Sequence, residues 1–336
     1  MTVPVITFFN NKGGVGKTSL VYHISWMLSE IGERVLACDL DPQANLTAMF
    51  LPEDRLESIY GAGTELLGRP ETVFECVRPL MEVGDLHTPV LSEVNENLWL
   101  IPGDLALAGF EDTLSAEWPN ALGSRQLHRP FRILSAFHTV MQQGAEQMEA
   151  TIILADVGPN LGAINRSAII ATDHVVVPVG ADLFSLLGLR NLGPTLRDWR
   201  ADWRKRLDNW REPAFDLPTG RMAPVGYVVQ QHGIRLGRPV QAYDKWVNRM
   251  PAEYARSLLG DHDGPYAPTP SQDCHALGTT RHYRSLVPMA QEARKPVFKL
   301  TAADGAIGSH AAAADSAYSD FGELARKLLE RTACHR

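Results

Sequence analysis

The sequence predicts an α/β fold built on a doubly wound, mostly parallel β-sheet with helical insertions. Two observations lead to this prediction. The first forty residues have the pattern strand, glycine-rich loop, helix and strand, which is a βαβ unit whose parallel strands are joined by a right-handed crossover. Further along the chain, apolar runs of strand length alternate with segments of helical periodicity, as in doubly wound sheets.

Composition and periodicity define the βαβ unit at the start of the chain. The run Val3–Phe9 is short and rich in β-branched and aromatic residues, which is typical of a buried strand. A loop follows at Asn10–Gly16, and a helix is expected from Lys17 to an end near Gly32. The second strand is expected at Arg34–Leu40. The apolar stripe of the helix consists of Leu20, Ile24, Leu28 and Ile31.

The later elements follow from the same patterns. Four more strands are expected, at Leu98–Ile101, Thr151–Asp156, His174–Val179 and Ala223–Val229. Helices are expected at Phe131–Met148 and at 311–331. The apolar face of the last helix consists of Tyr318, Phe321, Ala325 and Leu328. We therefore expect a single domain over residues 1–336, with insertions at 51–95 and 208–278 that are rich in turn residues.

Composition narrows the classes of function. The net charge of −7 argues against a protein that coats nucleic acid with its whole surface, so any contact with DNA requires a local basic patch. The four cysteines are scattered, which indicates neither a disulfide framework nor a zinc site. The start of the chain lacks the pattern of a signal peptide, and no apolar stretch reaches the roughly 18 residues that span a bilayer. A cytoplasmic location is expected.

The strongest motif is Lys-Gly-Gly-Val-Gly-Lys-Thr at Lys12–Thr18. Its glycines allow the backbone to wrap around phosphate oxygens, and the N-terminus of the following helix adds oriented N–H groups. In such a loop Lys17 reaches the β- and γ-phosphates, and the hydroxyl of Thr18 ligates Mg²⁺. A glycine-rich turn that binds nothing is disfavoured by the order strand, loop and helix. The expected nucleotide-binding residues are Gly13, Gly14, Val15, Gly16, Lys17, Thr18 and Ser19.

Two aspartates end the second strand. Asp39 and Asp41 point to the same side because side chains alternate along a strand. They emerge at the carboxyl edge of the sheet, where such folds bind ligands. One carboxylate there can orient an attacking water, and the other can hold water bound to a metal. Asp41-Pro42 is also a common opening of a turn, but its pairing with the phosphate loop favours a function.

Both motifs resemble those of the ParA/MinD ATPases, which are P-loop NTPases of the SIMIBI type with a deviant Walker A motif. Asn11 replaces the usual first glycine of the loop. The resemblance implies that Lys12 crosses a dimer interface to the partner's nucleotide and that Asp41 positions water. It also implies that Asp39 lies near Mg²⁺ and that Asp156 supports the ion through water. Val157-Gly158-Pro159 after Asp156 departs mildly from the family pattern.

The resemblance has clear limits. It is good over 1–50 and fair over 151–195, 222–232 and 283–331. The segments 51–150 and 233–280 show no match, and the chain's specific task is expected there. Base contacts are expected at the polar residues after a late strand, Gln230 and above all Gln231, and at Pro288 in a second late loop. Asn165 matches a recurring asparagine whose role is open.

Together these features predict a switch that dimerises on binding ATP and Mg²⁺ and hydrolyses the ATP. The resemblance implies a ParA/Soj-like role in the partition of plasmid or chromosomal DNA, or in the positioning of another cargo. Non-specific DNA and a partner protein that stimulates hydrolysis are the expected partners. Two alternatives stay open. One is an ATP-dependent ligase of the same fold, such as the cobyrinic acid amidases, and the other is a regulatory ATP-binding subunit with a protein or membrane partner.

Two stretches can contact such partners. Between Leu196 and Arg211 an apolar helical face is flanked by arginines, which can grip a phosphate backbone, although a core helix with a solvated flank is the favoured interpretation. The face consists of Leu196, Trp199, Trp203, Leu207 and Trp210, and the flank of Arg197, Arg200, Arg204 and Arg211. A second basic group consists of Arg281, Arg284, Arg294 and Lys295. The tail Glu323–Arg336 reads as a closing core helix, which disfavours membrane binding.

Overall fold

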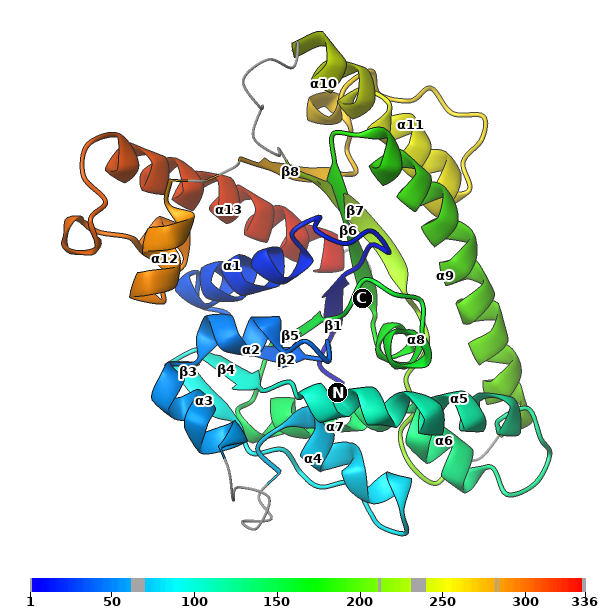
Figure 1. Ribbon diagram of the computed structural model, residues 1–336. Coiled ribbons are helices and arrows are strands. Elements are labelled where there is room, and N and C mark those ends of the chain that lie inside the picture. Colours follow the sequence, from blue (N-terminus) through cyan, green and yellow to red (C-terminus); the bar gives the residue numbers. More distant parts are fainter. Residues whose placement is uncertain are drawn as a thin grey trace. The chain divides into compact units, whose positions relative to one another are not determined.

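A computed structural model describes residues 2–61, 70–210, 213–230, 240–281, 283 and 285–333. Its strands form an eight-stranded sheet in the order β3-β4-β2-β5-β1-β6-β7-β8 (Figure 1). The strands are β1 (Val5–Phe8), β2 (Val35–Asp39), β3 (Ser92–Asn95), β4 (Leu98–Ile101), β5 (Ile152–Asp156), β6 (His174–Gly180), β7 (Ala223–Gln230) and β8 (Ala276–Thr280).

The sheet is mostly parallel, which confirms the predicted fold class. The pairs β1·β5, β2·β5, β2·β4 and β7·β8 are parallel, whereas β3·β4 is antiparallel. All six expected strands are present, and two more were not predicted. The strand β3 has the sequence SEVN and β8 has ALGTT, so neither carries the apolar run that marks a buried strand. Both lie at the ends of the strand order, where one side of a strand has no neighbour.

Helices connect the strands. The α-helices are α1 (Lys17–Glu30), α2 (Asn45–Phe50), α3 (Glu53–Tyr60), α4 (Val73–Val77), α5 (Phe110–Asn120), α6 (His128–Leu134), α7 (Ala136–Gln147), α8 (Ala163–Ile170), α9 (Leu183–Asn209), α10 (Val240–Val247), α11 (Met250–Tyr254), α12 (Val287–Ala293) and α13 (Ser309–Ala333). None of the helices that the structure describes is long and apolar enough to cross a membrane.

The single helix expected at Phe131–Met148 is wrong. The structure has two helices, α6 and α7, separated at Ser135. The hydroxyl of Ser135 donates to the carbonyl oxygen of Phe131 over 2.7 Å, and its backbone leaves the helical region at φ −98° and ψ 6°. A serine that bonds back to the preceding turn bends or ends a helix. The apolar periodicity continues across this break, which is why the sequence concealed it.

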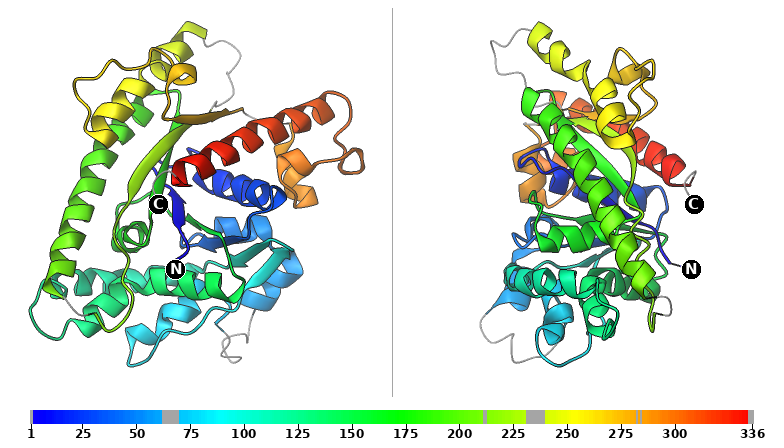
Figure 2. Two further views of the ribbon diagram at one scale, coloured as in Figure 1. Left: turned by 180° about the vertical axis from the view of Figure 1, so that it is seen from behind. Right: turned by 90° about the vertical axis from the view of Figure 1, so that its right-hand side faces the viewer.

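The described residues group into two compact units. The first unit takes its residues from 1–7, 28–174 and 197–223, and the second from 8–27, 175–196 and 224–336. The first unit holds β2 to β5 and the helices α2 to α8, and its strands β2 and β5 are fully buried. The second holds β7, β8 and α10 to α13, with most of β6 and α1. In it α13 packs beside α1, as the reverse view in Figure 2 shows, and His23 stacks on Phe321 at 4.8 Å.

The aromatic face of α9 belongs to the core of the first unit. Trp203 is fully buried and donates its indole N–H to the carbonyl oxygen of Pro218 over 2.8 Å. Arg206 is 3% exposed and lies over the ring of Trp118 at 3.6 Å. Arg200 donates to the backbone carbonyl oxygens of Arg221 and Met222. These contacts favour the core-helix interpretation of this stretch, of which Arg211 lies outside the described residues.

Candidate nucleotide site

The glycine-rich loop belongs to the second unit and joins β1 to α1. Gly14 and Gly16 have φ of 73° and 72°, in the left-handed region that favours glycine. A Cβ atom at Gly13 or Gly14 would meet no atom within 4 Å, so the outer side of the loop is open. At Gly16 a Cβ atom would lie 3.0 Å from the side-chain nitrogen of Gln230. The loop therefore presents an open backbone on one side and packs against the end of β7 on the other.

Lys17 folds back over this loop. Its ammonium group donates to the carbonyl oxygens of Asn10 (3.2 Å) and Lys12 (3.4 Å), and the residue is 7% exposed. Asn10 is buried and fixes the start of the loop, because its amide donates to the carbonyl oxygen of Pro178 and its oxygen accepts the N–H of Lys12. Thr18 follows in the first turn of α1. A buried ammonium beside open glycine backbone suits a phosphate group.

Lys12 forms an ion pair within its own chain. Its Nζ lies 2.6 Å from Oδ2 of Asp182 and 3.3 Å from the hydroxyl of Ser185, in the second unit. Asp182 also accepts the backbone N–H of Ser185 in the first turn of α9. Burial works to raise the pKa of Asp182, but the hydrogen bonds from Lys12 and Ser185 outweigh it and hold that pKa below its ordinary value. The lysine is therefore held at the start of α9.

A cavity of about 250 Å³ adjoins the loop in the second unit. His23 forms part of its wall. The imidazole Nε2 accepts the N–H of Val297, and burial lowers the pKa of His23 to about 4, so the ring is neutral at pH 7. Both apolar and polar side chains line the cavity, a combination that suits a flat heteroaromatic ring. Its lining residues are Gly14, Gly16, Ser19, Leu20, His23, Gln230, Thr280, Arg281, Tyr283, Val287, Val297 and Phe321.

The structure describes only some of the residues predicted to contact the base. Gln231 lies outside the described residues, whereas its neighbour Gln230 lines the cavity. Pro288 was expected in a loop, which is wrong, because it lies exposed in the first turn of α12 next to the lining residue Val287. Proline is well suited to a first turn because that turn does not need its N–H group. The sequence missed Tyr283, Thr280 and Arg281, since no motif marks β8 or the residues after it.

The acidic residues belong to the first unit. Asp39 and Asp156 end two paired strands, are partners in the register of β2 and β5, and are both fully buried. The carboxylate of Asp39 accepts the N–H and hydroxyl of Thr47 at 2.9 and 2.7 Å and the N–H of Asp41 at 3.2 Å. Burial raises the pKa of Asp39 to about 6, against the lowering effect of these hydrogen bonds. Asp39 thus organises the turn that carries Asp41.

Gly103 permits this arrangement and was not predicted. A Cβ atom at this position would lie 2.8 Å from the carboxyl carbon of Asp39, which is closer than real contacts allow. Its N–H donates to the hydroxyl of Thr47 over 2.8 Å, and that hydroxyl donates in turn to Asp39. This glycine, the second residue after β4, therefore supports the end of β2.

Asp41 lies against the loop that follows β5. It is 8% exposed and accepts the N–H of Gln43 over 3.0 Å. A Cβ atom at Gly158 would lie 3.4 Å from Oδ1 of Asp41. The side-chain amide of Asn165 donates to the carbonyl oxygens of Gly158 (3.0 Å) and Asn160 (2.8 Å). These two hydrogen bonds tie the loop to α8.

Sheet topology relates these residues. The strand β5 pairs in parallel with β1 on one side and with β2 on the other. Within the first unit, Asp39 ends β2 and Asp156 ends β5. The carboxyl ends of parallel neighbouring strands meet at one edge of a sheet, and α/β proteins bind ligands at that edge.

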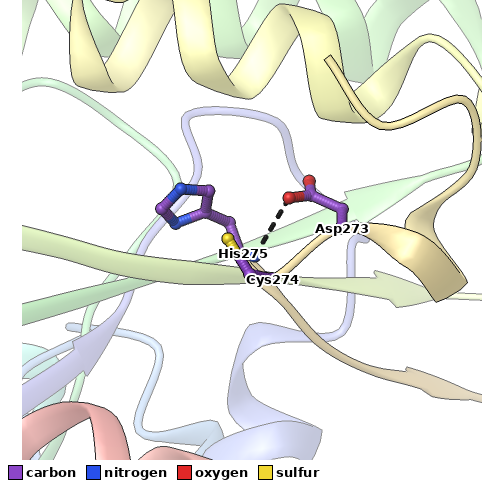
Figure 3. Close-up of side chains that lie close together, drawn as sticks. All are labelled: Asp273, Cys274 and His275. Carbon is purple, nitrogen blue, oxygen red and sulfur yellow. Dashed lines mark hydrogen bonds between the residues drawn. The ribbon is translucent and has the colours of Figure 1, made fainter. Parts of the chain in front are cut away.

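A second group of potential ligands lies in the second unit. The side chains of Asp273, Cys274 and His275 have donor atoms within 4.8 Å of one another (Figure 3). The carboxylate of Asp273 already accepts the hydroxyl of Tyr227 at 2.7 Å and the N–H of His275 at 3.0 Å. The guanidinium of Arg331 donates to the carbonyl oxygen of Cys274. These bonds join the start of β8 to β7 and α13, and the nearby cation disfavours a metal ion.

Comparison with known proteins identifies the family. A family model described as an AAA domain matches residues 3–209, which is more than half of the chain. The protein Soj of Bacillus subtilis, a sporulation initiation inhibitor, is 31% identical over 193 residues, or 57% of this chain and 64% of Soj. The chromosome partitioning protein ParA of Caulobacter vibrioides is 29% identical over 204 residues, or 61% and 66% of the two chains. The chain belongs to the ParA/MinD family.

The matches to these ParA/MinD relatives span less than two thirds of their length. The solved structure of a putative plasmid partition protein from Borrelia burgdorferi, bound to AMPPNP, shares the fold. Its TM-score is 0.58 at 17% identity, covering 98% of this chain and 99% of that one. The family model runs through 51–150, a segment that showed no resemblance in the sequence alone, whereas 233–280 lies beyond it.

Proposed function

We propose that the chain is an ATP-driven switch that binds ATP and Mg²⁺, dimerises and hydrolyses the ATP, in the partition of DNA or the positioning of another cargo. The observation that carries the proposal is Lys17, whose buried ammonium rests on the carbonyl oxygens of a glycine loop with an open outer side. A lysine at the end of a glycine-rich loop is a well-known kind of phosphate-binding group. Relatives named for sporulation control and chromosome partitioning support the cellular role.

The proposed roles follow the geometry of each unit. The backbone of the loop and Lys17 bind the phosphates, and the cavity beside Gln230 and Tyr283 takes the base. Thr18, Asp39 and Asp156 would hold Mg²⁺, directly or through water, and the ion would neutralise charge on the phosphate oxygens. Asp41 orients the attacking water. The AMPPNP bound by the Borrelia protein supports ATP as the nucleotide.

Dimerisation is proposed through the surface around Lys12. This lysine lies at the start of α9, where Leu183, Phe184 and Leu187 are 44%, 68% and 39% exposed. An exposed apolar cluster beside a charged group is typical of an interface. In the dimer Lys12 would leave Asp182 and contribute its charge to the partner's nucleotide, as an arginine finger does. Slow hydrolysis without a partner protein is then expected.

The proposal of a DNA partner is supported more by the relatives than by a basic patch among the described residues. Arg200 and Arg206 contact carbonyl oxygens and a tryptophan ring inside the first unit. In the second basic group, Lys295 pairs with Asp304 at 2.8 Å and Arg281 with Asp320 at 3.5 Å, and Arg284 lies outside the described residues. The proposed DNA contact is therefore local and sensitive to salt.

The test is DNA binding by the purified protein with ATP, with ADP and with neither, across a salt series, with Lys12→Ala and Lys17→Ala alongside. Binding that requires ATP and is lost in both variants supports the partition switch. An ATP-dependent dimer without DNA binding in any state overturns the DNA partner and leaves a protein or membrane cargo. A dimer with negligible turnover favours the regulatory-subunit alternative, and turnover that requires a small acid favours the ligase.

A further inference from the structure

Glu111, in the first turn of α5, turns its carboxylate to the N-terminus of α8. Its Oε1 accepts the N–H of Ala163 at 2.5 Å and its Oε2 the N–H of Ile164 at 2.8 Å. The first N–H groups of a helix have no partner within the helix, and a negative charge there is favourable. The position that normally supplies a local cap is Gly162, which has no side chain. A glutamate from another helix therefore takes over the capping of α8.

The lack of a side chain at Gly162 leaves room for this carboxylate. A Cβ atom on Gly162 would lie 2.6 Å from Oε1 of Glu111, so any other residue would displace the acid. The N–H of Gly162 is bonded to the side-chain oxygen of Asn160 over 2.9 Å. The last residues before α8 are thus fixed from two sides, by their own loop and by α5.

The same helix holds the other end of the loop. Asn165 lies in the first turn of α8 beyond the two capped residues, and its amide donates to the carbonyl oxygens of Gly158 and Asn160. Gly158 packs against the carboxylate of Asp41, the residue that we propose to orient water. The loop 157–162 therefore lies between Asp41 at one end and the start of α8 at the other, and Glu111 is the side chain that fixes that start.

We propose that Glu111 is a positioning residue for ATP hydrolysis, which sets the place of Asp41 through α8, Asn165 and Gly158. This inference rests on the proposed function and extends it to a helix outside every sequence motif. The carboxylate of Glu111 bonds to the backbone of α8 and belongs to no nucleotide-binding motif, so we expect its loss to change hydrolysis and not nucleotide affinity. A small displacement of a group that orients a reactant reduces the rate strongly, by up to about a hundredfold per Å.

The test compares Glu111→Gln with Glu117→Gln. Glutamine keeps the length of the side chain but removes the charge and one of the two acceptor oxygens. We expect kcat to fall by roughly tenfold, with KM and the Kd for ATP within about twofold of the parent. Glu117 lies six residues further along α5 in an ion pair with Arg129, with side chains 12% and 55% exposed, so its replacement controls for a charge change on the same helix. Asn165→Ala, which releases the loop from its other side, should give the same kinetic signature as Glu111→Gln.

Hydrogen exchange supplies a readout that does not need turnover. The amides of Ala163 and Ile164 should exchange faster in Glu111→Gln than in the parent or in Glu117→Gln, and thermal melting confirms that each variant is folded. Faster exchange with an unchanged kcat would mean that Glu111 is only a helix cap and would overturn its positioning role. A parent protein that binds ATP without hydrolysing it overturns the proposed function and this role together. If Glu111→Gln does not fold, the measurement is made on Asn165→Ala. An unchanged kcat in that variant overturns the inference.

Discussion

The Nζ atom of Lys12 lies 2.6 Å from Oδ2 of Asp182 in the same chain. The family resemblance implies that this lysine reaches the nucleotide of a partner subunit, whereas in this structure it pairs with an aspartate of its own chain. Both side chains are 29% exposed, and a pair in such a position contributes about 1 kcal/mol or less. The lysine can therefore exchange Asp182 for a phosphate at a small cost.

Asp182→Asn tests this exchange. Asparagine keeps the oxygen that accepts the N–H of Ser185, but it no longer attracts the ammonium of Lys12. We expect the ATP-dependent dimer to form two- to fivefold more tightly, which corresponds to roughly 0.5–1 kcal/mol. Sedimentation with a non-hydrolysable ATP analogue measures it. Asp202→Asn, which removes an exposed pair with Lys205, is the matched control. Equal effects in both variants would show that the pair between Lys12 and Asp182 has no specific effect on dimerisation.

Lys17→Ala should weaken nucleotide binding strongly. The ammonium is buried against the loop, and each hydrogen bond from a charged donor to phosphate contributes about 1.5–3 kcal/mol, so affinity for ATP should fall at least roughly a hundredfold. Calorimetric titration with ATP and Mg²⁺ gives the Kd. Lys12→Ala is the control within the same loop and should lose hydrolysis while it still binds ATP. An unchanged Kd in Lys17→Ala would remove the basis of the nucleotide site.

Arg200→Ala and Arg204→Ala separate packing from DNA contact on α9. Arg200 satisfies two backbone carbonyl oxygens, so its loss should lower the free energy of unfolding by about 1–3 kcal/mol in urea denaturation. Arg204 is exposed and should leave stability unchanged within about 0.5 kcal/mol.

The same two variants test whether α9 contacts DNA. If Arg204 contacts a phosphate, its removal should lower the salt slope of DNA binding by about one. The core-helix interpretation predicts an unchanged slope. A stable Arg200→Ala protein with impaired DNA binding would contradict that interpretation.

Stability should fall in acid because of buried neutral histidines. Burial lowers the pKa of His138 to about 4, while the charge of Asp216 works in the other direction. The unfolded chain protonates near pH 6.5, so between pH 6.5 and about 4 it binds more protons than the folded chain. Stability contributed by His138 is therefore complete above pH 6.5 and falls by up to about 1.4 kcal/mol per pH unit below it.

His138→Gln isolates this effect, because His23 titrates in the same direction and Asp39 in the opposite one. The difference in unfolding free energy between the parent and His138→Gln should shrink as the pH falls from 6.5 to 4. Chemical denaturation at fixed pH values measures it. A difference that stays constant across this range would show that His138 keeps an ordinary pKa in the folded protein.

The features that could be predicted from the sequence are those set by residues close together in the chain. The glycine-rich loop, the strand that ends in Asp39 and the strand that ends in Asp156 carry their patterns in a few adjacent residues. The division at Ser135 could not be predicted, because one serine hydroxyl interrupts a periodicity that is otherwise continuous. Tyr283 also lines the cavity, but it follows β8, which has no apolar signature, so no sequence pattern marks it. The base contacts were therefore the weakest part of the predicted site.

Long-range contacts explain the remaining omissions. Glu111 caps a helix that begins 52 positions further along the chain. Its neighbours along α5 give no hint of that partner. The predicted roles of Asp39, Asp41 and Asp156 remain predictions, but their burial and the register between β2 and β5 accord with a shared site.

Gly103 has a consequence for engineering. The segment 51–150 is the natural place to graft new specificity, because it carries none of the motifs of the nucleotide site. Yet one position in it tolerates no side chain without displacing the carboxylate of Asp39. A library that randomises this segment should lose ATPase activity at position 103 as sharply as at the glycines of the phosphate loop. Any redesign must therefore treat Gly103 as part of the nucleotide site and leave it unchanged.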